Sequence, residues 1–166
     1  DLNGCQDSGL ILLTEPPDLL ITFTSLNNVS CNGTCDGQVT ASVTGGVLPY
    51  IYSWSDPSSQ TDSIATGLCA NLYIVVASDS NGCTSTDTVL IIDPPALSLL
   101  STSFDATCGN QDGSIIVIAV GGLGTYSYLW DDPNAQTTST AAGLGAGVYT
   151  VIVSDSIGCS DTLVVT

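Results

Sequence analysis

The chain has 166 residues with no Lys, Arg, His or Met, and its 16 acidic residues give it a net charge of −16. A surface of this charge repels nucleic-acid phosphates and anionic lipid head groups, so neither is expected as a partner. Because no His, Lys or Arg is available as a base or oxyanion partner, we expect no enzyme and no catalytic residues.

The apolar residues point to folded cores rather than disorder. They make up 43% of the chain and occur in short runs of Val, Ile, Leu, Tyr and Ala. The longest run, Ser114–Gly124, is too short and too rich in Gly to cross a bilayer, so we expect no membrane insertion.

The first 17 residues repeat a phrase that returns later in the chain. Residues 1–17 (DLNGCQDSGLILLTEPP) align with residues ending at Pro95 at an offset of 78, which places Cys5 on Cys83. We therefore expect residues 1–17 to be the final strand of a preceding repeat. Its twin prolines, like those at 94–95, would act as a semi-rigid linker.

The rest of the chain contains two further copies. Residues 35–54 (CDGQVTASVTGGVLPYIYSW) align with residues 111–130 (QDGSIIVIAVGGLGTYSYLW) at an offset of 76. This predicts two full repeats, residues 18–95 and residues 96–166.

Each repeat has the pattern of a β-sandwich. A strand run ends at Gly-Gly, an alternating run ends at Trp, and a Tyr-containing run and a final strand follow, with turn residues between them. No segment has a convincing helical period. The alternation places Trp54 and Tyr73, and likewise Trp130 and Tyr149, in the predicted cores.

Acidic turns provide the candidate metal and catalytic positions. "DSNG" before Cys83 spaces oxygen ligands as a Ca²⁺ loop does, but it lacks a distal acidic ligand, so a tight turn is favoured and we expect no cofactor. Asp131 and Asp132 are interpreted as a turn after the Trp strand, in the position of residues 55–57.

The order C…DG…GG…PY.Y.W…GL.AG.Y.V.VSD..GC resembles the SprB-type repeat of Bacteroidetes cell-surface adhesins. The matching positions of the first repeat are Cys31, Asp36, Gly37, Gly45, Gly46, Pro49, Tyr50, Tyr52, Trp54, Gly67, Leu68, Tyr73, Asp79, Gly82 and Cys83. Those of the second are Cys108, Asp112, Gly113, Gly121, Gly122, Tyr126, Tyr128, Trp130, Gly143, Leu144, Gly147, Tyr149, Asp155, Gly158 and Cys159. The resemblance implies tandem Ig-like domains in long secreted adhesins, exported by type IX secretion and displayed as filaments, some of which serve gliding motility.

The seven cysteines suggest disulfides in an oxidising, extracellular setting. By repeat position, we expect the pairs Cys31–Cys83 and Cys108–Cys159, with Cys5 bonded to a residue upstream of the chain. The additional Cys35 and Cys69 are expected to pair with each other. Sequence alone leaves three pairings of four cysteines open, and Cys83–Cys108 across the linker is an alternative.

Four Asp-(Ser/Thr)-apolar triplets resemble the O-glycan acceptor pattern of Bacteroidetes secreted proteins. They make Ser63, Thr88, Ser156 and Thr162 the candidate glycosylation residues.

These observations predict a structural segment of a repetitive filament at the cell surface, which acts by reach, mechanical stability and multivalent contact. Its expected partners are neighbouring repeats and surface polysaccharide. Two other functions stay open: a carbohydrate-binding module, and a fibre subunit that polymerises by strand exchange with Leu10–Thr14 as donor.

Overall fold

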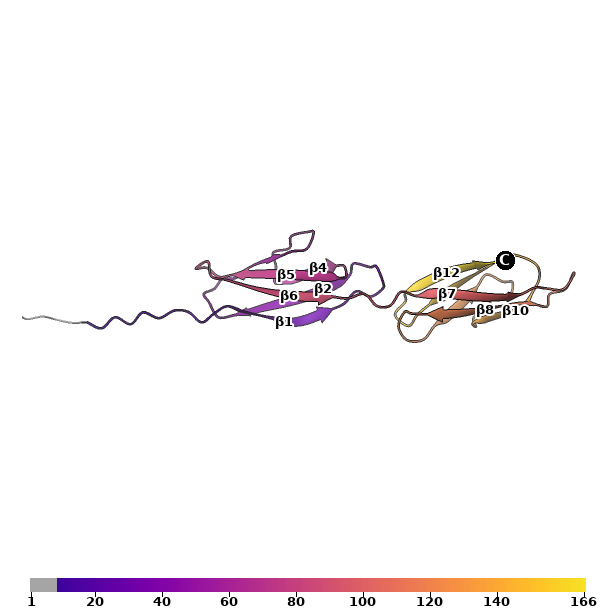
Figure 1. The fold of residues 1–166 in the computed structure, drawn as a ribbon, viewed down its shortest axis with the longest axis horizontal. Coiled ribbons are helices and arrows are strands. Elements are labelled where there is room, and N and C mark those ends of the chain that lie inside the picture. The colour runs from indigo at the N-terminus through magenta and orange to yellow at the C-terminus, as the bar shows by residue number, and fades with distance from the viewer. Residues whose placement is uncertain (1–8) are drawn as a thin grey trace, which may run out of the picture.

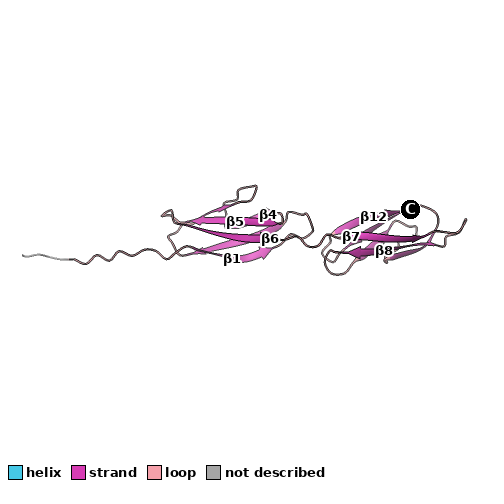
Figure 2. Cartoon of the chain, viewed as in Figure 1, coloured by secondary structure: helices cyan, strands magenta, loops and turns pink. Residues whose placement is uncertain are grey.

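The computed structural model describes residues 9–166 and folds them into two successive groups of six strands (Figure 1). The first group is β1 (Leu20–Asn27), β2 (Gly37–Thr44), β3 (Ile51–Trp54), β4 (Ile64–Leu68), β5 (Asn71–Ser78) and β6 (Thr84–Ile91). The second is β7 (Ser98–Phe104), β8 (Gly113–Val120), β9 (Ser127–Trp130), β10 (Thr140–Leu144), β11 (Tyr149–Ser154) and β12 (Ser160–Val165). Residues 9–166 contain strands and loops only (Figure 2), and so no helix that could cross a membrane.

Each group of strands forms two antiparallel sheets that pack face to face. The sheets have the orders β1-β2-β4 and β3-β5-β6 in the first group, and β10-β8-β7 and β12-β11-β9 in the second. If the six strands are lettered A, B, C, E, F and G, the sheets are ABE and CFG. This is the immunoglobulin arrangement without its D strand.

Alternation along the strands builds a separate core in each sandwich. On β5 the side chains of Tyr73, Val75 and Ala77 are buried, while their neighbours face outward. Trp54 and Trp130, the last residues of β3 and β9, are only 3% and 2% exposed. Each belongs to the buried cluster of its own sandwich.

Two further features are typical of immunoglobulin-like domains. The Tyr73 hydroxyl donates a hydrogen bond to the backbone oxygen of Cys69 at 3.0 Å, and Tyr149 does the same to Gly145 at 3.1 Å. These are tyrosine corners at the start of the F strand, and the buried Trp lies on the C strand, as in that fold. The all-β, tandem Ig-like fold predicted from the sequence is confirmed.

The connection from β3 to β4 leads from one sheet to the other without reversing the direction of the chain. β4 runs opposite to β2, and β5 runs back after a turn of two residues. Since β3 pairs antiparallel with β5, β3 and β4 run the same way. β3 pairs with the last half of β5, and β4 with the first half of β2, so the crossing lies at mid-height.

A buried carboxylate and an amide side chain hold this crossing in place. Asp56 is 5% exposed and accepts hydrogen bonds from the backbone N–H of Ser58 and Gln60 at 3.0 and 2.9 Å. The Gln60 side chain then pairs with the backbone of Thr66 on β4, donating and accepting at 3.0 Å each. Burial opposes ionisation of Asp56, but hydrogen bonds from Gln60 and Ser58 outweigh it and lower the Asp56 pKa.

The second sandwich repeats this network. Asp132 accepts from the backbone N–H of Gln136 at 2.8 Å, and the Gln136 side chain pairs with the backbone of Ala142 on β10. Asp132, which belongs to the Asp131–Asp132 pair weighed as catalytic, therefore serves the backbone of its own turn.

The crossing decides which loops share an end of the sandwich. The β1–β2 loop and the β4–β5 turn lie at the end nearest the second group of strands, which we call the downstream end. The β2–β3 loop and the β5–β6 turn lie at the opposite, upstream end (Figure 1). In the second sandwich the β7–β8 loop is downstream and the β11–β12 turn is upstream.

Candidate functional site: the inter-repeat junction

The two sandwiches meet end to end, and the segment between β6 and β7 is held by hydrogen bonds to the first sandwich. The N–H of Ile92 donates to Asn28 Oδ1 at 3.0 Å. The Gly33 N–H donates to Asp93 Oδ1 at 3.1 Å, and Asn32 Nδ2 donates to the Pro94 carbonyl at 3.0 Å.

The second sandwich holds the same segment through its Gly-Gly turn. The Gly122 N–H donates to the Pro95 carbonyl at 2.9 Å. Gly121 has a φ of 78°, and a Cβ at this position would lie 1.9 Å from the Ala96 carbonyl oxygen. The glycine is therefore required for the close approach of the two backbones. The first sandwich receives the segment before β1 in the same way, because the Gly46 N–H donates to the Pro17 carbonyl at 2.7 Å.

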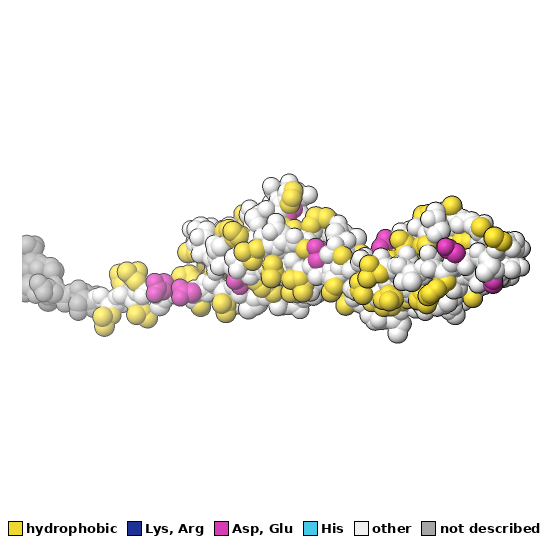
Figure 3. Space-filling view, turned by 45° about the vertical axis from the view of Figure 1, so that its right-hand side comes forward, with side chains coloured by type: hydrophobic (Ala, Val, Ile, Leu, Met, Phe, Trp, Pro, Cys, Tyr) yellow, Lys and Arg dark blue, Asp and Glu magenta, His cyan; other side chains and the backbone are white. Residues whose placement is uncertain are grey.

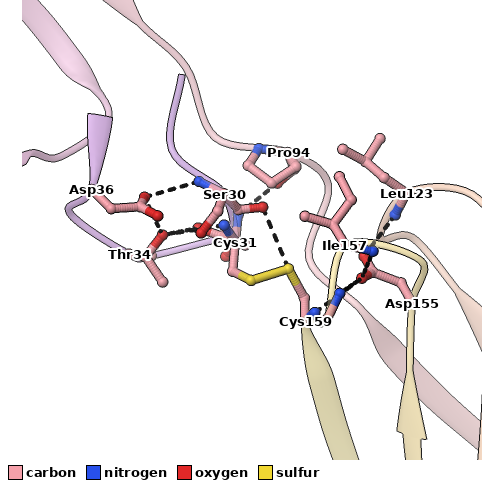
Figure 4. Close-up of a disulfide and its surroundings, with 12 residues drawn as sticks. Ser30, Cys31, Thr34, Asp36, Pro94, Leu123, Asp155, Ile157 and Cys159 are labelled. Carbon is pink, nitrogen blue, oxygen red and sulfur yellow. Dashed lines mark hydrogen bonds between the residues drawn. A yellow bond between two sulfur atoms is a disulfide. The ribbon is translucent and has the colours of Figure 1, made fainter. Parts of the chain in front are cut away.

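A disulfide closes the junction beside this segment. It joins Cys31 in the β1–β2 loop to Cys159 in the β11–β12 turn, with an S–S distance of 2.01 Å and a Cα–Cα distance of 5.6 Å (Figure 4). The Cys159 sulfur also lies 3.4 Å from the Ser30 carbonyl oxygen. The two cysteines are 128 residues apart in the sequence. For a loop of this length, the loop-entropy model assigns the bond about 5 kcal/mol of stabilisation.

The loop that carries Cys31 is shaped by Asp36. Asp36 Oδ1 accepts from the Ser30 N–H at 2.9 Å and from the Thr34 hydroxyl at 3.0 Å, and the Thr34 N–H donates to the Cys31 carbonyl at 3.0 Å (Figure 4). Hydrogen bonds from Ser30, more than those from Thr34, lower the pKa of Asp36.

The turn that carries Cys159 is shaped by a second aspartate, Asp155, which is buried. Its Oδ2 accepts from the Leu123 N–H and its Oδ1 from the Cys159 N–H, both at 2.9 Å (Figure 4). The hydrogen bond from Leu123 makes the largest contribution to a lowered Asp155 pKa, against the opposing effect of burial. Since the chain has no cationic side chain, backbone N–H groups replace the missing counter-charge.

The expected pairs Cys31–Cys83 and Cys108–Cys159 are wrong in the structure. Cys31 lies at the downstream end of the first sandwich, whereas Cys83 follows β5 at the upstream end, with a strand of 8 residues, about 26 Å, between them. Cys108 and Cys159 are separated in the same way. The alternative Cys83–Cys108 bond does not form either, because both thiols are free.

A second disulfide joins Cys35 to Cys69, the pair expected of the two additional cysteines. The β3–β4 crossing places the β4–β5 turn beside the β1–β2 loop, which brings these residues together. Cys5 and the rest of residues 1–8 lie outside the described residues.

The other predicted residues lie away from the junction or at its edge. Thr88, Ser156 and Thr162 are exposed, and Ser63 is half-buried. Tyr73 is buried and Tyr149 half-buried. Among residues 9–166, no three His, Cys, Asp or Glu side chains gather as a metal site would require. The "DSNG" carboxylate of Asp79 accepts hydrogen bonds from Val47, Asn81 and Cys83 N–H groups.

Sequence reasoning missed the polar side chains that hold the linker, above all Asn28, Asn32 and Asp93. Their only signal was position: two Asn residues in the loop before the first Asp-Gly, and an Asp directly before the twin prolines. Neither motif shows by itself that the two segments meet.

The geometry defines this chain as a protein of tandem Ig-like sandwiches that are joined covalently across their junction. The family model of the SprB repeat matches residues 24–59 and, a second time, residues 100–135. The resemblance to the SprB-type repeat that the sequence predicted is thus confirmed at two places in the chain. Both matches run from the first strand of a sandwich to the turn after its Trp strand.

Several solved structures are similar to the chain. The N-terminal eight Ig domains of Down Syndrome Cell Adhesion Molecule isoform 1.30.30 match at 15% identity and a TM-score of 0.42, over 89% of this chain and 24% of that one. DIP-gamma Ig1+Ig2 matches at 13% and 0.41, over 90% and 96%. A tetra-tandem repeat in the extending region of a large adhesion protein matches at 13% and 0.29, over 92% and 49%. No curated relative matches the chain.

The close approach at Gly121 can be separated from the strain of its backbone conformation. Gly109 has nearly the same φ, 76°, but open space around it. Gly109→Ala should cost only the left-handed penalty of about 1–2 kcal/mol. Gly121→Ala should cost clearly more and loosen the linker, because its Cβ overlaps the Ala96 carbonyl. Urea unfolding of both variants checks this, and equal losses would contradict the close approach.

The lowered pKa of Asp155 predicts a pH dependence. An unfolded Asp titrates near 3.9, so the ionised form stabilises the fold above about pH 4, and this stability is lost as the pH falls through the lower folded pKa. Asp155→Asn should therefore be less stable than the parent at pH 7, and the difference should shrink below pH 4.

Urea unfolding at pH 7, 5 and 3 measures this difference. Repulsion among the 16 acidic residues acts in the opposite direction, but it affects all the proteins alike. Asp62→Asn serves as control, since its carboxylate makes no hydrogen bond in the described residues. A difference for Asp155→Asn that stays constant with pH would argue against the proposed role.

Proposed function

We propose that the chain is a load-bearing structural segment of a long, repetitive extracellular adhesin filament. The observation that carries this proposal is the junction, where the linker is bonded to both sandwiches and a disulfide crosses between them. Flexible linkers between domains allow bending, whereas this junction favours a fixed, extended rod. The disulfides support secretion to the cell surface, because such bonds persist in oxidising, extracellular environments. Gliding motility belongs to the same proposal, because some SprB-type adhesins serve it.

The disulfide gives the rod a covalent route for tension. Force applied at the two ends enters β1, reaches Cys31, crosses to Cys159 and leaves along β12. The sequence between these cysteines, a separation of 128 residues, is then shielded from extension. Strands β2 to β11 would thus be protected from extension, whereas β1 and β12 carry the load.

Multivalent contact is supported by the outer face of the CFG sheet, which exposes apolar side chains in both repeats. They are Ile51, Leu72, Ile74, Leu90, Leu129, Ile152 and Val164, and Val148 directly before β11 is exposed as well. The view in Figure 3 shows apolar side chains spread over both sandwiches, with acidic side chains standing singly among them. A weak contact made by one such face would gain strength by repetition along a filament.

Two of the candidate O-glycan residues lie on the same outer face. Thr88 is opposite Ile74 in the β5–β6 pair, and Thr162 is opposite Ile152 in the β11–β12 pair. Glycans at these residues would cover part of the apolar face. We therefore include them in the proposal as modifications that tune its contacts, with surface polysaccharide as a partner of the uncovered part.

The domain boundaries 18–95 and 96–166 are supported by the two separate cores. Residues 10–14 are also consistent with a final strand of another repeat. By repeat position Ile11 corresponds to Val89 and Leu13 to Ile91, which are buried, yet Ile11 and Leu13 are 86% and 91% exposed. This exposure equally favours strand exchange as a second candidate function, with the same segment as donor.

Single-molecule pulling between residues 18 and 166 tests the load-bearing role. The fully extended length of the oxidised protein should be roughly 45 nm shorter than that of the reduced protein, because the disulfide keeps the segment between its two cysteines, a separation of 128 residues, from extending. The extended length of the oxidised double variant Cys31→Ser/Cys159→Ser should be only roughly 12 nm shorter than that of the reduced protein, because Cys35–Cys69 is the disulfide that remains. A long extension of the oxidised parent would contradict the proposal.

A further inference from the structure

We propose that Cys83 and Cys108 are the two open halves of the same inter-repeat disulfide, each of which bonds a neighbouring SprB-type repeat. Cys83 would bond the loop cysteine of the repeat before it, and Cys108 the turn cysteine of the repeat after it. The inference rests on the proposed function only in requiring neighbouring repeats in an array.

The two free thiols occupy the repeat positions of the two bonded cysteines. Cys83 follows β5 as Cys159 follows β11, and Cys108 lies between β7 and β8 as Cys31 lies between β1 and β2. Cys31 and Cys159 form the disulfide at the observed junction, whereas Cys83 and Cys108 are exposed free thiols. The two free thiols are thus the equivalents of the two bonded ones, one of each kind.

The turn around Cys83 already has the geometry of its bonded equivalent. Asp79 Oδ1 accepts from the Cys83 N–H at 2.9 Å, as Asp155 does from Cys159. The Asp79 N–H donates to the Cys83 carbonyl at 3.0 Å, and the same bond measures 2.9 Å at Asp155. Asp79 Oδ2 is bonded to the Val47 N–H, which ties this turn to the β2–β3 loop. Oxidation therefore requires no rearrangement of the turn.

The loop around Cys108 is also organised in advance. The Thr107 N–H donates to Asp112 Oδ1 at 2.7 Å, matching the bond from Ser30 to Asp36 in the Cys31 loop. The Thr107 hydroxyl adds a second bond to Asp112 at 2.7 Å. The Cys108 loop is one residue shorter than the Cys31 loop, but the same Asp fixes its base.

An apolar pocket lies beside the Cys108 loop. It is lined by Phe104, Ile115, Leu144 and Tyr149, among others. In the first repeat the corresponding place holds Ile91, which is 1% exposed and packs against Gly37. A residue equivalent to Ile91, followed by a linker and a next repeat, would fill the pocket and bring a turn cysteine toward Cys108.

The two thiols lie at opposite ends of the rod, because the β5–β6 turn is upstream and the β7–β8 loop is downstream (Figure 1). They therefore cannot bond each other within one chain, and bonds to neighbours would extend the array in both directions. With every junction closed in this way, tension would pass from disulfide to disulfide along the filament.

The chemistry needs a two-electron oxidant, which we take to be a small-molecule disulfide such as oxidised glutathione. The Cys108 thiolate attacks that disulfide, and one glutathione leaves. The thiolate of the neighbouring turn cysteine then attacks the Cys108 sulfur of the mixed disulfide and releases the second glutathione. Two protein thiols lose two protons and two electrons, and one glutathione disulfide becomes two thiols.

The test is a tandem chain in which residues 13–166 directly follow Thr166. By repeat position Thr166 corresponds to Leu90 and Leu13 to Ile91, so the natural register and the LTEPP linker are kept. After oxidation in a glutathione buffer, cleavage before Asp and non-reducing mass mapping should find residues 105–111 bonded to residues 79–86. Residues 18–35 contain both Cys31 and Cys35, so they should be bonded to residues 155–160 through Cys31–Cys159 and to residues 62–78 through Cys35–Cys69. This three-peptide species provides the internal reference.

The same substitution in either copy is the matched control. Cys83→Ser in the second copy should abolish the bond between residues 105–111 and 79–86, while Cys83→Ser in the first copy should leave it intact. The inference would be overturned if Cys108 of the first copy and Cys83 of the second copy stayed free thiols in a chain whose Cys31–Cys159 bonds have formed. Bonds between like positions, Cys83 to Cys83 or Cys108 to Cys108, would overturn it as well. Loss of the load-bearing behaviour in the pulling experiment would leave this map unchanged, so the two proposals fail independently.

Discussion

The crossing between β3 and β4 is the constraint on which the rest of the structure depends. Because it moves the chain to the other sheet without a reversal, the β1–β2 loop and the β5–β6 turn lie at opposite ends of each sandwich. Only with this arrangement does the loop of one repeat face the turn of the next across a short linker. At the crossing the buried Asp56 holds the half-buried Gln60, whose side chain forms hydrogen bonds to β4 in place of a length of sheet.

An all-anionic chain solves the problem of buried charge with its own backbone. Each repeat buries two aspartates, one at the crossing and one in the turn before the cysteine, and N–H groups surround both. A buried carboxylate of this kind costs less than an unpaired one because both of its oxygens accept hydrogen bonds. No buried side-chain polar atom in residues 9–166 lacks a partner. The turns that carry Cys83 and Cys159 are therefore held by hydrogen bonds to Asp79 and Asp155, without an ion pair between side chains.

Much of the fold could be predicted from the sequence because its signals are local. Alternation placed Trp54 and Tyr73 on inward faces, and Gly-Gly and Asp-containing phrases marked the turns. The candidate site was not predictable in the same way. Pairing Cys31 with Cys83 by repeat position requires both residues to lie at the same end of the sandwich, and the one connection without a reversal places them at opposite ends. The same connection brings Cys69 to Cys35.

The sequence by itself determined the repeat, the all-β architecture, the absence of cationic side chains and the resemblance to the SprB repeat, since each follows from residue identity and spacing. Only the tertiary structure decided that the cysteines act between repeats rather than within them. The reason is that a disulfide requires two Cα atoms to lie within a few ångströms, and Cys31 and Cys159 reach 5.6 Å through the stacking of two sandwiches. Their separation of 128 residues carries no local signal of that contact.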